Sequence, residues 1–466
     1  MSNDNWEILI KKSKSFIIRR FIILGKGGDG VKVHLHSLGC KVNQYDTEAL
    51  AERFRSAGFT LSDSPEGCDV YVINSCTVTA VADQKSRQAI RKFRRMAPDA
   101  CVVLSGCMVQ AYPDKASSLE EADIVAGVRD LEKIIDHVNA FFEQRRGGAA
   151  DRVLDVAEHD RDETFQNLPI EEFLGRTQAF IKIQDGCNRR CSYCIIPTAR
   201  GRSRSRTLED LEQELQKIKA AGYREVVLVG INFCCYGPDI GKTFTDPIEL
   251  ACNMGFDRVR IGSLEFDNIS AASIEKLASF PNFCPQFHIS LQSGSDSVLR
   301  RMYRNYDTKA YRALCAQLRA TFPDGTITTD IMTGFPFETE EEFEESLAFA
   351  KEIGFEKIHV FPFSPRAGTP AADMQPQVPK AVKKERARRM IALGEELRTA
   401  FLERQVGRDL EVLCETFEDG MVTGHTANYT PVRFPSDRDR QNELVTVRID
   451  GVEKEQDACV GTLLSE

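Results

Sequence analysis

The sequence lacks an apolar run long enough to cross a membrane. Near its start, residues 16–18 and 21–24 are apolar, but Arg19 and Arg20 separate them, whereas a spanning helix needs about 20 consecutive apolar residues. No small-residue cleavage site follows, as a secretory signal would require. We therefore expect no membrane contact, and we interpret residues 1–30 as a disordered extension.

The sequence also lacks an excess of positive charge. It has 61 Lys and Arg against 70 Asp and Glu, a net charge of −9, which argues against a protein that coats nucleic acid through a uniformly basic surface. The basic residues are unevenly placed, however, because residues 85–95, 189–206 and 380–389 each hold six of them. Solvated helix faces explain any single run, whereas three runs together favour a partner that carries phosphates.

Because nothing indicates export, the 15 cysteines are poor candidates for disulfides. Disulfide-rich proteins are mostly small secreted domains, whereas thiols in the reducing cytosol serve metal binding or catalysis. We expect a cytoplasmic protein that uses some of its cysteines as metal ligands.

Three of these cysteines, Cys187, Cys191 and Cys194, form a C-x3-C-x2-C motif. Three thiolates this close can ligate three irons of a 4Fe–4S cluster and leave the fourth iron open to a substrate or cofactor. A structural zinc ion would need four ligands, and no fourth Cys or His lies close by in the sequence. Zinc and unligated cysteines are the alternatives, and the spacing favours the cluster.

A second set consists of Cys40, Cys76 and Cys107. Each follows a predicted strand and a small residue, and in an open parallel sheet the carboxyl ends of the strands form the ligand-binding edge. Three cysteines that meet there could hold a second cluster. The alternative is three buried, inert cysteines, which is how we interpret Cys68 and Cys101.

Between residues 31 and 145, apolar strand-like segments alternate with amphipathic helices. The predicted strands span residues 32–36, 69–73, 100–104 and 122–126. This alternation predicts a parallel sheet covered by helices on both faces, here the first domain of an α/β protein. The polar and acidic residues 146–172 are expected to be a linker.

Residues 173–401 repeat the alternation six times. Strands are predicted at residues 178–183, 225–229, 258–262, 286–291, 326–332 and 356–361. Six parallel βα units indicate an incomplete (βα)6 barrel rather than a closed eight-stranded one. Residues 402–466 hold short strands between turn residues, which predicts a small antiparallel β-barrel.

With both cysteine sets in place, the chain resembles the methylthiotransferases of the radical S-adenosylmethionine (SAM) superfamily. The resemblance rests on Tyr193, just before the last cysteine of the motif, and on residues 230–237, 291–295, 301–306, 329–336 and 359–370. It covers residue 31 to the C-terminus. It implies a flavodoxin-like N-terminal domain, a radical SAM core and a C-terminal TRAM domain.

Residues 38–48 and 196–206 resemble the branch of this family that acts on N6-threonylcarbamoyladenosine in tRNA. Enzymes of that branch replace the C2 hydrogen of this nucleoside, next to the anticodon, with a methylthio group. The alternatives are the branches that act on isopentenyladenosine in tRNA or on an Asp of a ribosomal protein.

The resemblance also implies two 4Fe–4S clusters and SAM as cofactors. Cys187, Cys191 and Cys194 would hold the cluster that cleaves SAM reductively, and Cys40, Cys76 and Cys107 an auxiliary cluster that carries the sulfur. No catalytic residue is expected beyond these ligands. By motif position, the SAM contacts would be Tyr193, Gly230, Ser263, Glu265 and Gln292. A core ion pair is the alternative role for Glu265.

The implied partners are the anticodon stem-loop of tRNA, an electron donor such as flavodoxin or ferredoxin, and a sulfur donor. The TRAM-like barrel, with Arg433, and the three basic runs would hold the RNA through its phosphates and stacked loop bases.

Overall fold

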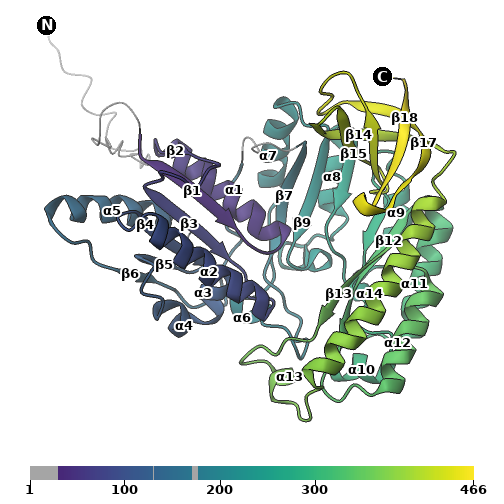
Figure 1. The fold of residues 1–466 in the computed structure, drawn as a ribbon, viewed down its shortest axis with the longest axis horizontal. Helices are drawn as coiled ribbons and strands as arrows, with labels where there is room; N and C mark the ends of the chain where they lie inside the picture. The colour runs from purple at the N-terminus through teal and green to yellow at the C-terminus, as the bar shows by residue number, and fades with distance from the viewer. Residues whose placement is uncertain (1–29, 130, 171–176, 466) are drawn as a thin grey trace, which may run out of the picture.

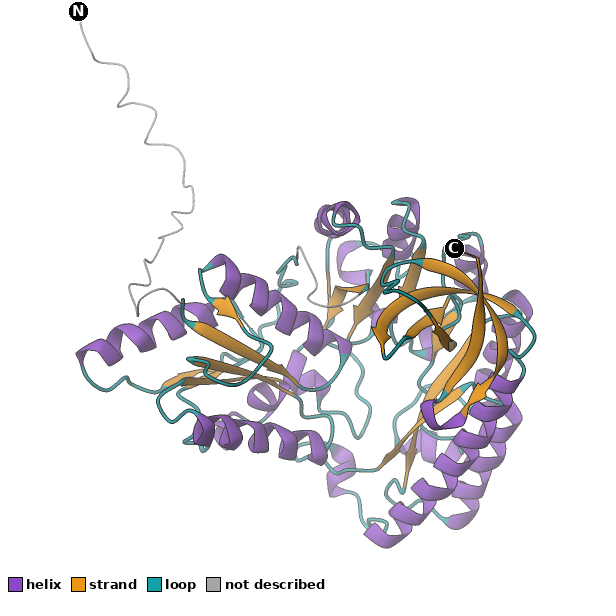
Figure 2. Cartoon of the chain, turned by 45° about the horizontal axis from the view of Figure 1, so that its top comes forward, coloured by secondary structure: helices purple, strands orange, loops and turns teal. Residues whose placement is uncertain are grey.

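The computed structural model describes residues 30–129, 131–170 and 177–465. Apart from Gly30, the expected extension at residues 1–30 lies outside this range. The described strands form a six-stranded sheet, sheets of four and three strands that follow it in the chain, and a closed barrel at the C-terminus. Figure 1 colours these parts along the chain, and Figure 2 shows their helices and strands.

The N-terminal sheet is parallel throughout, in the order β2-β1-β3-β4-β5-β6. Its strands are β1 (Lys32–Ser37), β2 (Thr60–Leu61), β3 (Val70–Ser75), β4 (Cys101–Gly106), β5 (Ile124–Ala126) and β6 (Val153–Asp155). The helices that connect them are α1 (Lys41–Ser56), α2 (Ala80–Met96), α3 (Cys107–Ala111), α4 (Pro113–Ser117) and α5 (Lys133–Gly147).

Helices cover both faces of this sheet because its central strands are apolar on both sides. Every residue of β3 and of β4 is buried. On one face, residues such as Val72 and Val103 pack against α1 and α5, and on the other, Ile73 and Leu104 pack against α2, α3 and α4. Helix α1 also contacts β7 of the next sheet, so it joins two parts of the fold.

The central part of the chain holds six parallel strands in two groups of three. The strands are β7 (Gln178–Asp185), β9 (Glu225–Gly230), β10 (Arg258–Ile261), β11 (Gln286–His288), β12 (Thr326–Thr333) and β13 (Lys357–Pro362). Isolated bridges, including one between Leu264 and Ile289, connect the two groups. The incomplete barrel is therefore confirmed, with a short antiparallel strand, β8 (Arg204–Ser205), added beside β7.

Helices surround these strands (Figure 1). They are α6 (Ile196–Arg200), α7 (Leu208–Ala220), α8 (Asp246–Asn253), α9 (Ala271–Ala278), α10 (Asp296–Arg301), α11 (Thr308–Thr321), α12 (Glu340–Ile353), α13 (Pro370–Asp373) and α14 (Lys380–Glu403). Several start with a side-chain cap. The best example is α12, where Thr339 and Glu342 form a reciprocal capping box that satisfies two of the free backbone N–H groups of the first turn.

The C-terminal strands close into a barrel in the order β14-β15-β16-β18-β17. They are β14 (Asp409–Glu418), β15 (Met421–Thr426), β16 (Pro431–Pro435), β17 (Leu444–Glu453) and β18 (Ala458–Ser465). The expectation of a purely antiparallel barrel is wrong, because β16 and β18 are parallel. A ring of five strands is odd-numbered, so it cannot close with antiparallel pairs alone.

This barrel packs against the amino-terminal ends of the core strands. Arg258, the first residue of β10, donates to the His425 carbonyl oxygen at 2.7 Å. The hydroxyl of Thr326, the first residue of β12, donates to the Asn428 carbonyl oxygen at 2.8 Å. The barrel therefore covers the edge opposite to the carboxyl ends of these strands.

The first domain extends beyond residue 145, where the sequence pattern placed its end. Strand β6 lies inside the expected linker and pairs with β5, and the Tyr45 hydroxyl of α1 donates to the Leu168 carbonyl oxygen at 2.9 Å. A strand of three residues has too little periodicity to be recognised in the sequence. Much of the expected linker is thus packed into the fold. No described helix combines the length and the apolar character needed to cross a membrane.

Candidate functional site

The three cysteines Cys187, Cys191 and Cys194, here called the core cysteine loop, follow the carboxyl end of β7. Gly186 precedes them with φ +73°, and a Cβ at that position would collide with the Arg202 carbonyl oxygen. Glycine is therefore required where the strand turns into the loop. The Cys194 N–H donates to the Cys191 carbonyl oxygen at 3.1 Å, so the loop is tightly turned.

Hydrogen-bond donors reach the sulfur atoms of the core cysteine loop from three places. The backbone N–H of Arg189 lies 3.4 Å from Cys187 Sγ, and Asn232 Nδ2 lies 3.5 Å from the same sulfur. Arg304 Nη1 lies 3.7 Å from Cys191 Sγ. Donors of this kind favour negative charge on sulfur, as ligands of a metal cluster require.

Cys40, Cys76 and Cys107, here called the N-terminal cysteine site, gather at the carboxyl edge of the first sheet. Cys40 is the N-cap of α1 after β1, Cys76 follows β3 directly, and Cys107 begins α3 after β4. These three strands are neighbours in the sheet. A Cβ on Gly39 would lie 2.9 Å from Cys76 Sγ, so the lack of a side chain there allows the Cys40 turn to approach Cys76.

Asn43, in the first turn of α1, contacts the loops of all three cysteines. Its side-chain amide donates to the Leu38 carbonyl oxygen at 2.8 Å and to the Ser75 carbonyl oxygen at 3.0 Å. These carbonyls lie just before Cys40 and Cys76 in the chain. The Cys107 thiol in turn donates to Asn43 Oδ1 at 3.7 Å. One buried side chain thus fixes the relative positions of the loops.

The described residues form no ready site for a single metal ion. Within the described part of the chain, no three Cys, His, Asp or Glu side chains converge on one point where an ion could bind. The ligands of a 4Fe–4S cluster bond to different irons, so they stand farther apart than ligands of one zinc ion. All 15 cysteines are free, so no disulfide competes for them.

Burial favours the protonated thiol at four of the six cysteines while no metal is bound. It raises the pKa of Cys107 and of Cys194 to about 12, and it also raises the pKa of Cys76 and of Cys191. A cluster that bound these cysteines would therefore release protons from them.

Two short helices join the cysteine sites. Helix α6 begins two residues after Cys194 and packs against α3, which begins with Cys107. Arg200, the last residue of α6, is 1% exposed, and its Nε donates to Cys107 Sγ at 3.1 Å. A residue from the segment that carries the core cysteine loop thus contacts a sulfur of the N-terminal cysteine site.

The residues expected to contact SAM lie on the same edge as the core cysteine loop. Gly230 ends β9, Ser263 and Glu265 follow β10, and Gln292 follows β11. Gln292 has φ +70°, and its N–H donates to the Asp330 carbonyl oxygen at 2.8 Å. These residues all lie at the carboxyl ends of the core strands, where they could line one binding site, as the sequence motifs predict.

Glu265 forms an ion pair, which is the role that the sequence left open as the alternative to a SAM contact. Its carboxylate lies 2.6 Å from Arg304 Nη1, the atom that also approaches Cys191. The pair therefore stands beside the core cysteine loop. Tyr193, the remaining expected contact, packs edge-on against Phe335 with ring centroids 6.4 Å apart.

One buried acceptor in this region has no partner. Asn232 donates through Nδ2 to Cys187, but its Oδ1 is buried and accepts no hydrogen bond from any described residue. A buried polar atom without a partner is costly. A bound ligand with an N–H group, such as the amino group of SAM, would satisfy it, so the residues present fit this cofactor.

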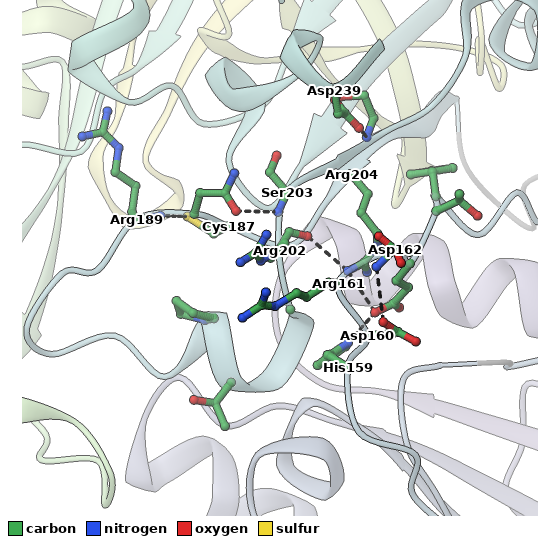
Figure 3. Close-up of a pocket in the computed structure, with 18 of the residues that line it drawn as sticks. His159, Asp160, Arg161, Asp162, Cys187, Arg189, Arg202, Ser203, Arg204 and Asp239 are labelled. Atoms are coloured by element: carbon green, nitrogen blue, oxygen red, sulfur yellow. Dashed lines mark hydrogen bonds and ion pairs between the residues drawn. The ribbon is translucent and has the colours of Figure 1, made fainter.

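A pocket of about 1480 Å³ opens beside the core cysteine loop (Figure 3). Residues 159–165, the core cysteine loop and most of residues 197–207 line it. Small-molecule sites commonly measure roughly 300–1,000 Å³, so this pocket admits more than a single cofactor. Arg161, Arg190 and Arg202 line it, are exposed, and pair with no carboxylate among the described residues.

Five arginines of the basic run at residues 189–206 divide into two groups in the structure, and the sixth, Arg189, is half-buried and pairs with Asp267. Arg200, Arg204 and Arg206 are buried and paired with carboxylates, so they are not available to a partner. Arg190 and Arg202 remain exposed. In the C-terminal barrel, Arg433 pairs with Glu453, which weakens its expected role as a phosphate contact.

The sequence patterns did not indicate the four side chains that contact sulfurs of the two cysteine sites: Asn43, Arg200, Asn232 and Arg304. Asn232 and Arg304 lie in segments that carry the family resemblance, and Asn43 and Arg200 lie in those that indicate the branch. That membership is the only signal that could have indicated them, because their partners are distant in the sequence.

Two family descriptions match the chain. "Uncharacterized protein family UPF0004" matches residues 32–127, and "Radical SAM superfamily" matches residues 181–350. The first match contains the N-terminal cysteine site, and the second contains the core cysteine loop.

Several characterised relatives match nearly the whole chain. A threonylcarbamoyladenosine tRNA methylthiotransferase MtaB of Bacillus subtilis (strain 168) is 39% identical over 90% of this chain and 93% of its own length. Its namesake from Thermotoga maritima is 34% identical over 91% and 95%. A tRNA-2-methylthio-N(6)-dimethylallyladenosine synthase of Symbiobacterium thermophilum is 32% identical over 90% and 92%.

Among solved structures, the radical SAM methyltransferase TsrM from Kitasatospora setae, with tryptophan and a SAM analogue bound, has a similar fold. The TM-score is 0.52 at 14% identity, over 80% of this chain and 90% of that one. At this identity the similarity concerns the fold alone.

Proposed function

The chain belongs to the radical SAM methylthiotransferase family, and from this membership we propose that it methylthiolates tRNA. The proposed substrate is N6-threonylcarbamoyladenosine next to the anticodon, and the proposed product carries a methylthio group in place of the C2 hydrogen. The choice of substrate rests on the similarity, over nearly the full length, to enzymes named for this nucleoside, such as one that is 39% identical.

The enzyme of this family needs two 4Fe–4S clusters and SAM, and we assign each cluster to one cysteine set. The core cysteine loop would hold the cluster that works with SAM, and the N-terminal cysteine site would hold the auxiliary one. The donors around the sulfurs support both assignments. The contact between α3 and α6 supports the idea that the two sites act on one substrate.

The chemistry also favours this assignment. The C2 hydrogen of an adenine is not acidic, so no side-chain base could remove it. The cluster and SAM, when bound, supply one-electron chemistry that can break such a bond. The residues of the chain hold and orient these groups: Asn232 and Arg304 beside the core cysteine loop, and Asn43 and Arg200 beside the N-terminal cysteine site.

For SAM itself we propose contacts from Gly230, Ser263, Glu265, Gln292 and Tyr193. The acceptor of Asn232 adds a sixth candidate. Because Glu265 is already paired with Arg304, we propose that it contributes a shared carboxylate, whose second oxygen is free to accept from the ligand.

We further propose that the anticodon stem-loop enters over the pocket beside the core cysteine loop. The exposed Arg161, Arg190 and Arg202 would meet its phosphates. The C-terminal barrel, a TRAM domain by resemblance, lies at the opposite edge of the core strands and would contact the stem rather than the modified base. An electron donor such as flavodoxin or ferredoxin and a sulfur donor would complete the reaction in the cytoplasm.

The test is nucleoside analysis of tRNA from a deletion strain by mass spectrometry. We expect 2-methylthio-N6-threonylcarbamoyladenosine to disappear and its precursor to accumulate, with restoration by the intact gene. A gene with alanine at the core cysteine loop should fail to restore it.

The alternatives predict other losses in the same strain. Loss of the methylthio group from isopentenyladenosine would indicate the dimethylallyladenosine branch, and loss of a methylthio group from a ribosomal protein would indicate the third branch. Either result with unchanged threonylcarbamoyladenosine products would refute the proposed substrate.

A further inference from the structure

Arg200 uses every nitrogen of its guanidinium group in contacts around the N-terminal cysteine site. Nε donates to Cys107 Sγ at 3.1 Å and Nη2 to Asn43 Oδ1 at 2.5 Å. Nη1 donates to Asp46 at 2.7 Å and to Asp185 at 3.2 Å. Because all three nitrogens make hydrogen bonds, the planar guanidinium group is held in one orientation.

These contacts come from both halves of the proposed active site. Asn43 and Asp46 belong to α1 and Cys107 to α3, all in the first domain, whereas Asp185 ends β7 in the core. Arg200 itself closes α6, the helix that follows the core cysteine loop. It therefore links the N-terminal cysteine site to the segment that carries the core cysteine loop.

The positive charge of Arg200 lies within a buried network of ion pairs. Lys182 pairs with Asp46 at 2.6 Å and with Asp185 at 3.2 Å, and the side chains of Lys182 and Asp46 are each 3% exposed. In such a low-dielectric setting, single charges act strongly on their neighbours. Adding or removing one of them would change the electrostatic potential at Cys107.

We propose that Arg200 is a positioning residue that orients Cys107 and, through its hydrogen bond and positive charge, raises the reduction potential of the group bound at the N-terminal cysteine site. This inference rests on the proposed assignment of a 4Fe–4S cluster to Cys40, Cys76 and Cys107. Hydrogen bonds to the ligand sulfurs and nearby charge are among the factors that set the potential of such clusters. A donor at Cys107 stabilises the more negative, reduced state.

A purely structural role for Arg200 makes a different prediction. If Arg200 served only to dock α6 on α3, then breaking the network from either side would loosen the site in the same manner. If it acts through charge, removing Arg200 and removing its partner Asp46 must shift the potential in opposite directions. The sign of the two shifts therefore separates the two roles.

The experiment uses full-length protein with Cys187, Cys191 and Cys194 all replaced by Ala, so that only the N-terminal cysteine site can be loaded. The reduction potential of the bound cluster is measured by a spectroscopic redox titration. We expect R200Q to lower the potential and D46N to raise it. R200K keeps the charge but loses the Nε donor, so its potential should lie between R200Q and the parent.

The matched control is R386Q. Arg386, on α14, is also buried, and it pairs with Glu338 and with Glu340 at the start of α12. Its loss should leave the potential unchanged. Shifts of R200Q and D46N in the same direction, no shift in either, or an equal shift in R386Q would overturn the inference. If R200Q does not fold, R200K decides, because a potential equal to the parent overturns the role of the Nε bond.

The outcome also separates this inference from the proposed function. If the parent protein binds no cluster at the N-terminal cysteine site, the assignment of that site is wrong and the inference fails with it. If the cluster is bound and its potential is insensitive to R200Q and D46N, only the role of Arg200 is refuted.

Discussion

Removing Arg206 should destabilise the core of this protein severely. Its side chain and that of Glu214 on α7 are both 0% exposed, and the two form an ion pair. Glu214 accepts two further hydrogen bonds, from the Ile170 N–H at 2.7 Å and from the Tyr45 hydroxyl at 3.2 Å. The pair thus ties α7 to α1 and to the segment before β7.

The substitution R206M would leave the Glu214 carboxylate buried without a counter-ion. Breaking a buried ion pair from one side costs about 3–5 kcal/mol, because the remaining charge is uncompensated. The double variant R206M/E214L removes both charges. It leaves the Ile170 N–H without an acceptor, which costs about 1–3 kcal/mol, so we expect the double variant to be more stable than R206M.

Hydrogen exchange is the suitable assay, because a chain with several cores does not unfold in one two-state step. Amides of α1 and α7 that exchange through local opening report the free energy of that opening. A loss of about 3–5 kcal/mol corresponds to exchange roughly 10²- to 10⁴-fold faster in R206M. Exchange within tenfold of the wild type, or a double variant less stable than R206M, would refute the argument.

Further predictions concern metal content and RNA binding. Reconstituted protein should hold about eight irons. Replacing all three residues of the core cysteine loop with alanine should leave about half of this iron and abolish SAM cleavage. Retained cleavage in that variant would contradict the assignment. Alanine at the N-terminal cysteine site should instead leave SAM cleavage intact and abolish methylthiolation, whereas loss of all iron would mean that the sites do not assemble independently. Replacing Arg161, Arg190 and Arg202 with Gln should weaken binding of an anticodon stem-loop and reduce the slope of log affinity against log salt by about 2, because each neutralised phosphate contributes roughly 0.7 to that slope. The control Arg388→Gln, an exposed arginine on α14 paired with Glu385, should leave that slope unchanged, and equal slopes in all variants would place the RNA elsewhere.

The sequence by itself determined the six parallel strands of the core and the two cysteine sets. The six strands predicted between residues 178 and 361 correspond to β7 and to β9 through β13, because apolar periodicity is a local property of the chain. The sequence also placed Cys40, Cys76 and Cys107 at the carboxyl ends of parallel strands, which share one edge of a sheet. The tertiary structure decided that their three strands are neighbours. Spacing alone selected the core cysteine loop.

Only the tertiary structure decided which polar side chains serve these sites. Arg200 and Cys107 are 93 residues apart, and no periodicity relates them; they meet because α6 packs on α3. The same holds for the basic run at residues 189–206, whose arginines look alike in the sequence but divide into buried ion-pair partners such as Arg206 and exposed residues such as Arg202. Local patterns encode secondary structure, whereas the surroundings of a charged group are determined by the long-range packing that brings its partners together.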